Sequence, residues 1–261
     1  IVFHPRMDFM LLAVDPIVNQ AANWSYVFAG QTNVPIVIRA VINRRGEQGA
    51  QHSQALHAMF AHIPGLKVVT PSTAYDAKGL LIAASRDGNP VMYIDDRCLY
   101  DDVGDVPEEM YEVPIGKAAI RRAGSDVTIV GISEMAAKLD NMQEQFVAAG
   151  IDAEIIDLRS IKPWDKECVL TSVEKTGRLV VVDGAWKTCS VAAEIAATVA
   201  DEAFYALKAP VGRVCLPDVP APSSKSQEAA YYITDEDILH GVQTVLKSSP
   251  GERRDALRPA G

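Results

Sequence analysis

The chain has 261 residues, of which 48% are hydrophobic and 23% are charged, and this balance is typical of a globular protein with a substantial core. Its formal net charge of −9 disfavours nucleic acid as a partner, because an acidic surface repels phosphate groups. The sequence contains no apolar run long enough to cross a bilayer and no signal peptide, so we expect a cytoplasmic protein, or a mitochondrial matrix protein if the source is eukaryotic. The first residues, Ile1 to Arg6, lack an initiator Met, and we expect the chain to be truncated or processed.

The N-terminal part of the chain alternates between predicted strands and a predicted helix. Short runs rich in β-branched residues predict buried strands at residues 34–40, 67–70 and 91–95. Thr73 is expected to cap a helix that extends to about Arg86, because Asp76 follows three residues later in a weaker form of the capping box.

A change in composition divides the chain. Residues 101–112 carry six acidic side chains and no basic one, and they include Gly104 and Pro107. Such a segment is typical of an exposed connector. We therefore expect a first domain over residues 1–113, with the connector near its end, and a second domain over residues 114–247.

The C-terminal part repeats the alternation. Strands are predicted at residues 126–131, 153–158, 179–183 and 211–216. Ser133, Ser190 and Thr234 are each expected to cap a helix, and Gly150 is expected to end the first of these. Apolar residues recur along that first helix at spacings of four, three and four, namely Met135, Leu139, Met142 and Phe146. The polar segment 248–261 is expected to be a disordered tail.

Strands that alternate with helices predict an α/β protein with parallel sheets covered by helices on both faces. The sequence contains no phosphate-binding loop, no G-x-G-x-x-G fingerprint, no G-x-S-x-G elbow and no H-E-x-x-H motif, so the usual nucleotide, hydrolase and zinc-protease functions lack support. The four cysteines are widely spaced and form no metal pattern, and we expect reduced, mostly buried thiols: Cys98, Cys168, Cys189 and Cys215.

Among the five histidines, His52 has the most distinctive surroundings. It follows the charged, glycine-containing segment 44–49 and lies between Gln51 and Ser53, where a loop is expected to turn into a helix. An imidazole in such a place can face a cleft and exchange a proton near neutral pH. A lone histidine is more often a structural hydrogen-bonding group, so these surroundings alone leave both interpretations open.

Several motifs in order resemble one family along nearly the whole chain up to the tail. They are Ala50-Gln51-His52-Ser53-Gln54, the segment 63–69 (IPGLKVV), the segment 75–81 (YDAKGLL), the segment 86–91 (RDGNPV), the segment 173–182 (VEKTGRLVVV) and the segment 217–222 (PDVPAP). Together they resemble the beta subunits of the thiamin-diphosphate-dependent pyruvate, acetoin and branched-chain 2-oxo acid dehydrogenases. The resemblance implies a transketolase-like pyrimidine-binding domain followed by a transketolase C-terminal-type domain.

The resemblance also implies partners and cofactors. Two alpha and two beta chains form the enzyme, the alpha subunit holds Mg²⁺ and the diphosphate of thiamin diphosphate, and the beta subunit covers the aminopyrimidine ring. The acyl group then passes to a lipoyl acyltransferase component. A Gly-Asp-Gly followed by a downstream Asn pair, the usual diphosphate and magnesium signature, is absent from this sequence.

Site residues follow from the same resemblance. His52 matches the catalytic histidine of the family, and Phe9 matches an aromatic residue that packs on the aminopyrimidine, although core packing is an equally good interpretation of Phe9. Five further residues match positions that bind a potassium ion in some members, several of them through backbone carbonyls: Ile36, Ala84, Ser85, Asp87 and Asn89. The composition of the segment 87–90 is explained equally well by a turn.

Two departures from the family pattern bear on function. The glutamate that activates the cofactor ring lies upstream of the segment that Ile1 begins and is not in this sequence. The segment 44–47 (RRGE) replaces a glycine-rich approach to the histidine. Pyruvate is the favoured substrate, and acetoin or branched-chain 2-oxo acids are alternatives. A transketolase-like enzyme half that uses Arg39, Arg44 and Arg45 as phosphate ligands, and a scaffold subunit without catalytic activity, also remain open.

Overall fold

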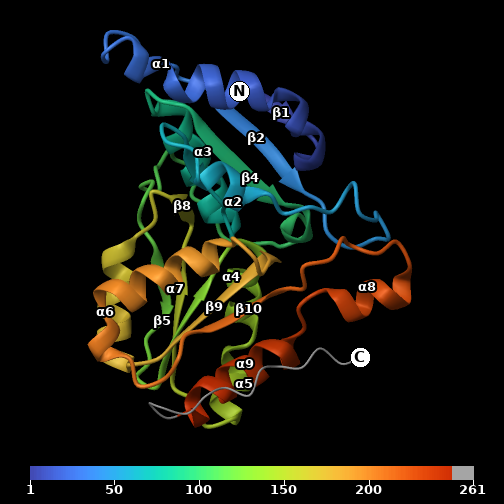
Figure 1. Cartoon of the computed structure of the whole chain (residues 1–261), viewed down its shortest axis with the longest axis vertical. Helices are drawn as coiled ribbons and strands as arrows, with labels where there is room; N and C mark the ends of the chain where they lie inside the picture. Colours follow the sequence, from blue (N-terminus) through green and yellow to red (C-terminus); the bar gives the residue numbers. More distant parts are fainter. Residues whose placement is uncertain (249–261) are drawn as a thin grey trace.

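Two five-stranded sheets follow one another along the long axis of the molecule (Figure 1). The computed structural model describes residues 1–248. The tail expected at residues 248–261 therefore lies outside the described residues from position 249 onward. Within residues 1–248, no helix has the length and apolar character that a membrane crossing needs.

The first sheet has the strand order β1-β2-β4-β3-β8. Its strands are β1 (Val2–His4), β2 (Val37–Ile42), β4 (Val91–Asp96), β3 (Lys67–Val69) and β8 (Ser160–Lys162). All neighbours are parallel except β8, which is antiparallel to β3. Ile42 lies opposite Asp96 at the carboxyl ends of β2 and β4, so the loops that follow these strands begin side by side.

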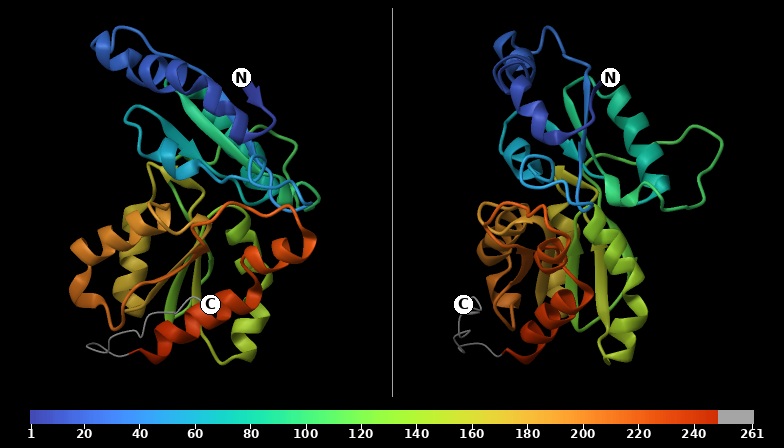
Figure 2. Two further views of the ribbon diagram at one scale, coloured as in Figure 1. Left: turned by 45° about the vertical axis from the view of Figure 1, so that its right-hand side comes forward. Right: turned by 90° about the vertical axis from the view of Figure 1, so that its right-hand side faces the viewer.

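Helices cover both faces of the first sheet (Figure 2). The short helical segments η1 (Met7–Ala13), η2 (Pro16–Ala21), α1 (Ala22–Val27) and α2 (His57–Ala61) lie on one face. The longer α3 (Ala74–Arg86) lies on the other face. The predicted cap of α3 is confirmed, because the Asp76 N–H donates to the Thr73 hydroxyl at 3.1 Å.

The second sheet has the order β10-β9-β6-β7-β5, with β5 as an antiparallel edge strand. Its strands are β10 (Gly212–Leu216), β9 (Leu179–Trp186), β6 (Val127–Gly131), β7 (Ala153–Asp157) and β5 (Ala119–Arg122). One face carries α6 (Lys166–Thr176) and α7 (Val191–Glu202), and the other carries α4 (Glu134–Asn141), α5 (Gln143–Ala148) and α9 (Asp235–Lys247). The remaining short helices are η3 (Arg97–Leu99), η4 (Phe204–Ala206) and α8 (Lys225–Tyr231).

Two of the three caps predicted in this half are confirmed. The Ser190 hydroxyl accepts from the Ala193 N–H, and Thr234 forms a full capping box with Asp237. The prediction for Ser133 is wrong. Its φ angle of 54° precludes the extended backbone of an N-cap, and its hydroxyl donates to the carbonyl of Pro71 at 3.4 Å instead.

The helix predicted after Ser133 is also interrupted, because α4 ends before Met142 and α5 begins after it. Its four predicted apolar positions are nevertheless all buried, and Gly150 takes the predicted left-handed conformation after the end of α5, with φ at 71°. The predicted hydrophobic face is therefore present, although it is divided between α4 and α5.

The four cysteines are free, as expected. Their predicted burial is not met. Cys98, Cys168 and Cys215 are half-buried and Cys189 is exposed, because Cys189 lies in the turn that leads into α7.

The two sheets share one continuous hydrophobic cluster. On the side of α2, α6 and α7, buried residues run from Met92 and Ile94 of the first sheet to Val130 and Val181 of the second without interruption. The strand β8, which follows β7 in the chain, joins the first sheet. Residues 101–112 are largely exposed and contain neither a regular helix nor a strand, but a clean division of the chain near residue 113 stays a prediction.

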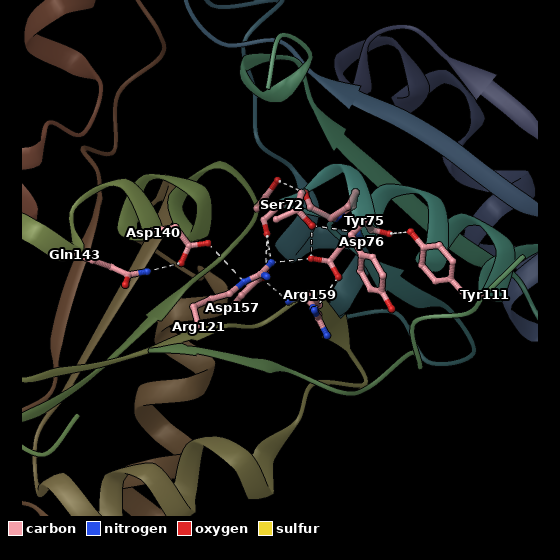
Figure 3. Close-up of polar contacts among 12 residues, drawn as sticks. Ser72, Tyr75, Asp76, Tyr111, Arg121, Asp140, Gln143, Asp157 and Arg159 are labelled. Atoms are coloured by element: carbon pink, nitrogen blue, oxygen red, sulfur yellow. Dashed lines mark hydrogen bonds and ion pairs between the residues drawn. The ribbon is translucent and has the colours of Figure 1, made fainter. Parts of the chain in front are cut away.

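A buried network of charges joins the sheets on the opposite side (Figure 3). Arg121 of β5 binds the carboxylates of Asp76 of α3 and Asp157 of β7 at 2.7 and 2.8 Å. Arg159 binds Asp76 at 2.9 Å, and the hydroxyl of Ser72 donates to Asp157. Both carboxylates are fully buried, so the two arginines supply the charge that keeps them there.

Candidate active site

The loop that carries His52 leaves the carboxyl end of β2 and ends at α2. Four of its residues have left-handed backbone, with φ angles of 64° at Arg45, 74° at Gly46, 61° at Glu47 and 71° at Gly49. This conformation is unfavourable for residues with a side chain, so the loop depends on contacts from its surroundings. The N–H of His52 donates to the carbonyl of Gly49 at 3.3 Å and closes the loop.

The structure brings His52 and Phe9 into contact. Their ring centroids are 5.2 Å apart and the ring planes meet at 81°, which is an edge-to-face arrangement. Such pairs contribute about 1 kcal/mol beyond the area they bury. His52 is half-buried and Phe9 is 51% exposed, so core packing does not explain Phe9. Two residues assigned from separate parts of the sequence thus form one partly open surface.

Asp8 connects the segment that carries Phe9 to the segment that carries His52. It is 5% exposed, and its Oδ1 accepts from the backbone and side-chain N–H groups of Gln54 at 3.0 Å each. Its Oδ2 is buried and has no hydrogen-bond partner among residues 1–248. Leaving such an acceptor unsatisfied costs roughly 1–3 kcal/mol. This oxygen is therefore a buried acceptor beside His52 that no donor of the described residues satisfies.

The three arginines of this region are all paired with carboxylates. Arg39 binds Asp95 at 2.5 Å. Arg44, with 3% of its side chain exposed, binds Asp96 at 3.2 Å and Glu134 at 3.2 Å. The guanidinium of Arg45 binds the second oxygen of Glu134 at 2.7 Å. These pairs connect the carboxyl ends of β2 and β4 to the start of α4, and they leave none of the three arginines as an unpaired phosphate ligand.

A group of possible metal ligands lies beside Arg44. Within the described part of the chain, Asp96, Cys98 and Glu134 place one ligand atom each within 4.8 Å of the others. The Arg44 guanidinium already supplies a positive charge to both carboxylates. Burial and the two neighbouring carboxylates raise the pKa of the Cys98 thiol to about 12, so it stays protonated at neutral pH. We therefore assign this group a structural role.

His57 has the structural role that is common for a lone histidine. It is 1% exposed, and its Nε2 lies 3.0 Å from Oδ1 of Asp183 on β9. Burial raises the pKa of the Asp183 carboxyl, but His57, Arg44 and the N–H of Ala185 outweigh burial, and the net result is a lowered pKa. The pair links the first helix after the His52 loop to the second sheet.

The expected potassium-binding residues lie at two neighbouring places. The segment at Ile36 meets the start of β4, where the Val91 N–H donates to the carbonyl of Ile36 at 3.0 Å. The end of α3 contributes Ala84, whose carbonyl accepts from the Asp87 N–H at 3.3 Å. These carbonyls already have donors, so a cation would have to share them.

The side chains of the same group have partners as well. The Asp87 carboxylate pairs with the ammonium of Lys67 and accepts from the Asn89 N–H at 2.9 Å, as in a turn stabilised by an aspartate. The hydroxyl of exposed Ser85 donates to Leu81 within α3 at 2.8 Å. The turn interpretation therefore accounts for these side chains, and potassium binding stays a prediction.

Comparisons with known proteins agree with this architecture. A family model for the pyrimidine-binding domain of transketolase matches residues 4–101, and a model for the transketolase C-terminal domain matches residues 116–238. The beta subunit of acetoin:2,6-dichlorophenolindophenol oxidoreductase from Cupriavidus necator is 46% identical over 241 residues, which cover 92% of this chain and 71% of that protein.

The chain belongs to the transketolase-like beta subunits of the thiamin-dependent 2-oxo acid dehydrogenases. A second relative, the beta subunit of the pyruvate dehydrogenase E1 component from Rickettsia conorii, is 43% identical over 239 residues, which cover 91% of this chain and 73% of that protein. A solved structure described as a split-gene transketolase in an inactive beta4 tetramer superimposes with a TM-score of 0.78 at 24% identity, over 95% of this chain and 77% of that one. That structure supports the fold alone.

The family resemblance and the α/β fold expected for these beta subunits are thus confirmed. Sequence reasoning missed Asp8, which holds Gln54 beside His52, and Glu134, which binds two arginines of the loop. Neither residue stands in a motif, and no local pattern distinguishes them from surface acids. Their partners lie 46 and up to 90 residues away in the chain.

Proposed function

We propose that this chain forms the beta half of the active centre of a thiamin-diphosphate-dependent 2-oxo acid dehydrogenase, with pyruvate as the preferred substrate. The observation that carries the proposal is the contact of His52 with half-exposed Phe9 at 5.2 Å. An imidazole and an open aromatic face, side by side at the carboxyl edge of a parallel sheet, suit a site that binds a flat heterocycle and moves protons.

The residues around His52 fit the aminopyrimidine of the cofactor. Phe9 offers an apolar face on which such a ring can pack, and the adjacent Asp8 offers a buried acceptor oxygen of the kind that an amino group needs. When bound, thiamin diphosphate supplies the carbanion chemistry of decarboxylation. His52 would donate and accept protons while the acyl group is transferred to a lipoyl group.

Other parts of the active centre are assigned to other chains. We propose that two copies of this chain assemble with two alpha subunits, which hold Mg²⁺ and the diphosphate, and that a lipoyl acyltransferase accepts the product. The relatives are named beta subunits, and this name supports the proposal that the partner is a different subunit, the alpha subunit. The carbonyl groups near Ile36 and Ala84 would serve a potassium ion. Free cysteines and bacterial and mitochondrial relatives support a cytoplasmic or matrix location.

Acetoin is the second candidate substrate. It is favoured by the Cupriavidus necator relative, which acts on acetoin by its name and is 46% identical to this chain. A sugar-phosphate substrate is disfavoured because Arg39, Arg44 and Arg45 are each engaged by carboxylates.

Co-expression with the alpha subunit tests the proposal. The chain, expressed from its full reading frame, is purified with its partner, and thiamin diphosphate binding is measured by calorimetry. Dye reduction is then followed with pyruvate, acetoin, branched-chain 2-oxo acids and sugar phosphates. We expect turnover with pyruvate, and turnover with acetoin alone selects the second candidate. A complex that binds the cofactor but turns over none of these compounds contradicts the proposal and favours the scaffold.

A further inference from the structure

The loop of residues 44–49, which leads to His52, is held by side chains from the C-terminal half of the molecule. We propose that Glu228 and Tyr232 are positioning residues that fix the backbone of this loop and thereby place the His52 imidazole. The proposal rests on the catalytic role proposed for His52. Figure 1 shows α8, which carries Glu228, at the edge of the molecule beside this loop.

Both side chains accept hydrogen bonds from backbone N–H groups of the loop. The two carboxylate oxygens of Glu228 each lie 3.1 Å from the N of Glu47. The hydroxyl of Tyr232 accepts from the N–H of Arg45 at 3.2 Å. Glu228 and Tyr232 are four residues apart in the chain, and the two loop amides that they bind, those of Glu47 and Arg45, are two residues apart. The contact with Glu47 joins residues 181 positions apart in the chain.

The two amides belong to residues whose backbone needs such support. Arg45 and Glu47 carry side chains but have φ angles of 64° and 61°. Backbone N–H groups in this kind of conformation form a concave site that favours an anion. The Glu228 carboxylate supplies the anion, and the hydrogen bonds hold a conformation that a free loop would leave.

Glu228 has no other evident reason to be buried. It is 7% exposed, and no Lys or Arg of the described residues lies within ion-pair distance of it. A buried carboxylate without a cation is unfavourable unless hydrogen bonds compensate for the lost water. At this position the compensation comes from the amide of Glu47.

A separate anchor holds the start of the loop. Arg44 and Arg45 bind Glu134 at 3.2 and 2.7 Å, independently of α8. Loss of the Glu228 contact is therefore expected to free residues 46–49 and the adjacent His52 without unfolding the molecule. This separation makes the positioning role testable.

The test uses Glu228→Ala, Glu228→Gln and Tyr232→Phe in the full chain, with Glu236→Gln and Tyr205→Phe as matched controls at exposed positions. Hydrogen exchange is measured at residues 45–52, and the imidazole signals are followed by NMR, with His52 assigned from His52→Ala. We expect Glu228→Ala to speed exchange at Glu47 about tenfold, as for the loss of one hydrogen bond, and to shift the His52 signal but not that of His240. Glu228→Gln keeps one acceptor oxygen and should have a smaller effect, and Tyr232→Phe should act at Arg45.

Kinetics of the reconstituted complex distinguish positioning from a general effect on stability. We expect Glu228→Ala to lower kcat about ten- to a hundredfold while KM changes less than about twofold. In the His52→Ala background the same change should cost little more, because the two residues act through one group. An unchanged exchange rate and an unchanged His52 signal in all three variants overturn the proposal, as does a full additional loss of kcat in the His52→Ala background. If the wild-type complex turns over no 2-oxo acid or acetoin, the proposed function fails, while exchange and NMR still decide the positioning role.

Discussion

A Cβ atom at Gly184 would lie 1.7 Å from Nη1 of Arg44. The guanidinium, which comes from the loop after β2, therefore passes directly over the backbone of β9. From there it reaches Asp96 and Glu134. Gly184, on a buried strand of the second sheet, thus leaves space for the Arg44 side chain. The ion pairs of Arg44 with Asp96 and Glu134 connect the His52 loop to both sheets.

Gly184→Ala should destabilise the protein. The added methyl must displace the guanidinium, which strains two buried ion pairs, and overpacking of this kind costs typically 1–3 kcal/mol. Urea denaturation measures the free energy of unfolding. Gly104→Ala is the matched control, because its added Cβ would meet only the Cβ of Ala74 at 3.8 Å. Equal stabilities of the two variants would show that Arg44 moves aside without cost.

Asp183→Asn should destabilise the protein at neutral pH by about 1.5–3 kcal/mol, which is typical of a hydrogen bond to a charged group. The pKa of Asp183 is lowered in the folded state, since His57 and Arg44 outweigh the effect of burial. The folded state then binds fewer protons than the unfolded state, so the stabilisation is complete above the unfolded pKa of about 3.9 and is lost as pH falls through the lower folded value. The difference between wild type and variant, measured by urea denaturation, should therefore shrink below about pH 4. Exposed Asp201→Asn is the control, and a difference that stays constant down to pH 3 would contradict this origin.

Arg121→Met should destabilise the protein by about 3–5 kcal/mol, because it leaves the buried carboxylates of Asp76 and Asp157 short of a cation. Burial already raises the pKa of Asp157, and Arg121 opposes this rise. Without Arg121 the pKa of Asp157 rises further. Between the unfolded pKa and this raised folded pKa, the folded variant binds more protons than the unfolded chain, so its stability should fall as pH increases. The neighbouring Arg122→Met is the control, because Arg122 pairs with half-exposed Asp152 and donates to the carbonyl of Ala153, so its loss leaves no buried carboxylate without a cation and should change stability much less. Thermal unfolding at pH 5 and pH 8 compares the two variants.

His52→Ala in the reconstituted complex should lower turnover about 10²- to 10⁴-fold, the range that proton transfer by a side chain contributes. Cofactor binding should change little, since Phe9 remains in place. Turnover with a lipoyl acceptor and calorimetry with thiamin diphosphate measure the two effects. Exposed His240→Ala is the control. Near-wild-type turnover of His52→Ala would assign His52 a structural role.

Phe9→Ala should weaken thiamin diphosphate binding by about tenfold, because it removes an aromatic contact worth roughly 1–1.5 kcal/mol. Its effect on the free energy of unfolding should be small, since the side chain is 51% exposed. Calorimetry on the complex measures the affinity, and urea denaturation of the chain alone measures stability. Phe204→Ala, at a side chain that is 61% exposed on η4, is the control. A large loss of stability with unchanged affinity would favour core packing for Phe9.

Local physical preferences explain what sequence reasoning predicted well. The strands β2, β4, β6 and β9 lie on short apolar runs that contain β-branched residues, and such residues suit the pleated, buried surface of a sheet. The caps at Thr73, Ser190 and Thr234 need only an amide three residues ahead. Ser133 shows where such reasoning stops, because its hydroxyl binds the carbonyl of Pro71, 62 residues away, and caps no amide of α4.

The sequence by itself determined the family, through motifs in a fixed order, and the same resemblance predicted that His52 and Phe9 belong to one site. Only the tertiary structure decided which side chains support them. Asp8, Glu134 and Glu228 look like ordinary acids in the sequence, and each gains its role from a partner 46 to 181 residues away. The reason is physical: a hydrogen bond or ion pair forms only where the folded chain brings two groups together, and the spacing of residues in a local stretch of sequence does not determine which distant groups come into contact.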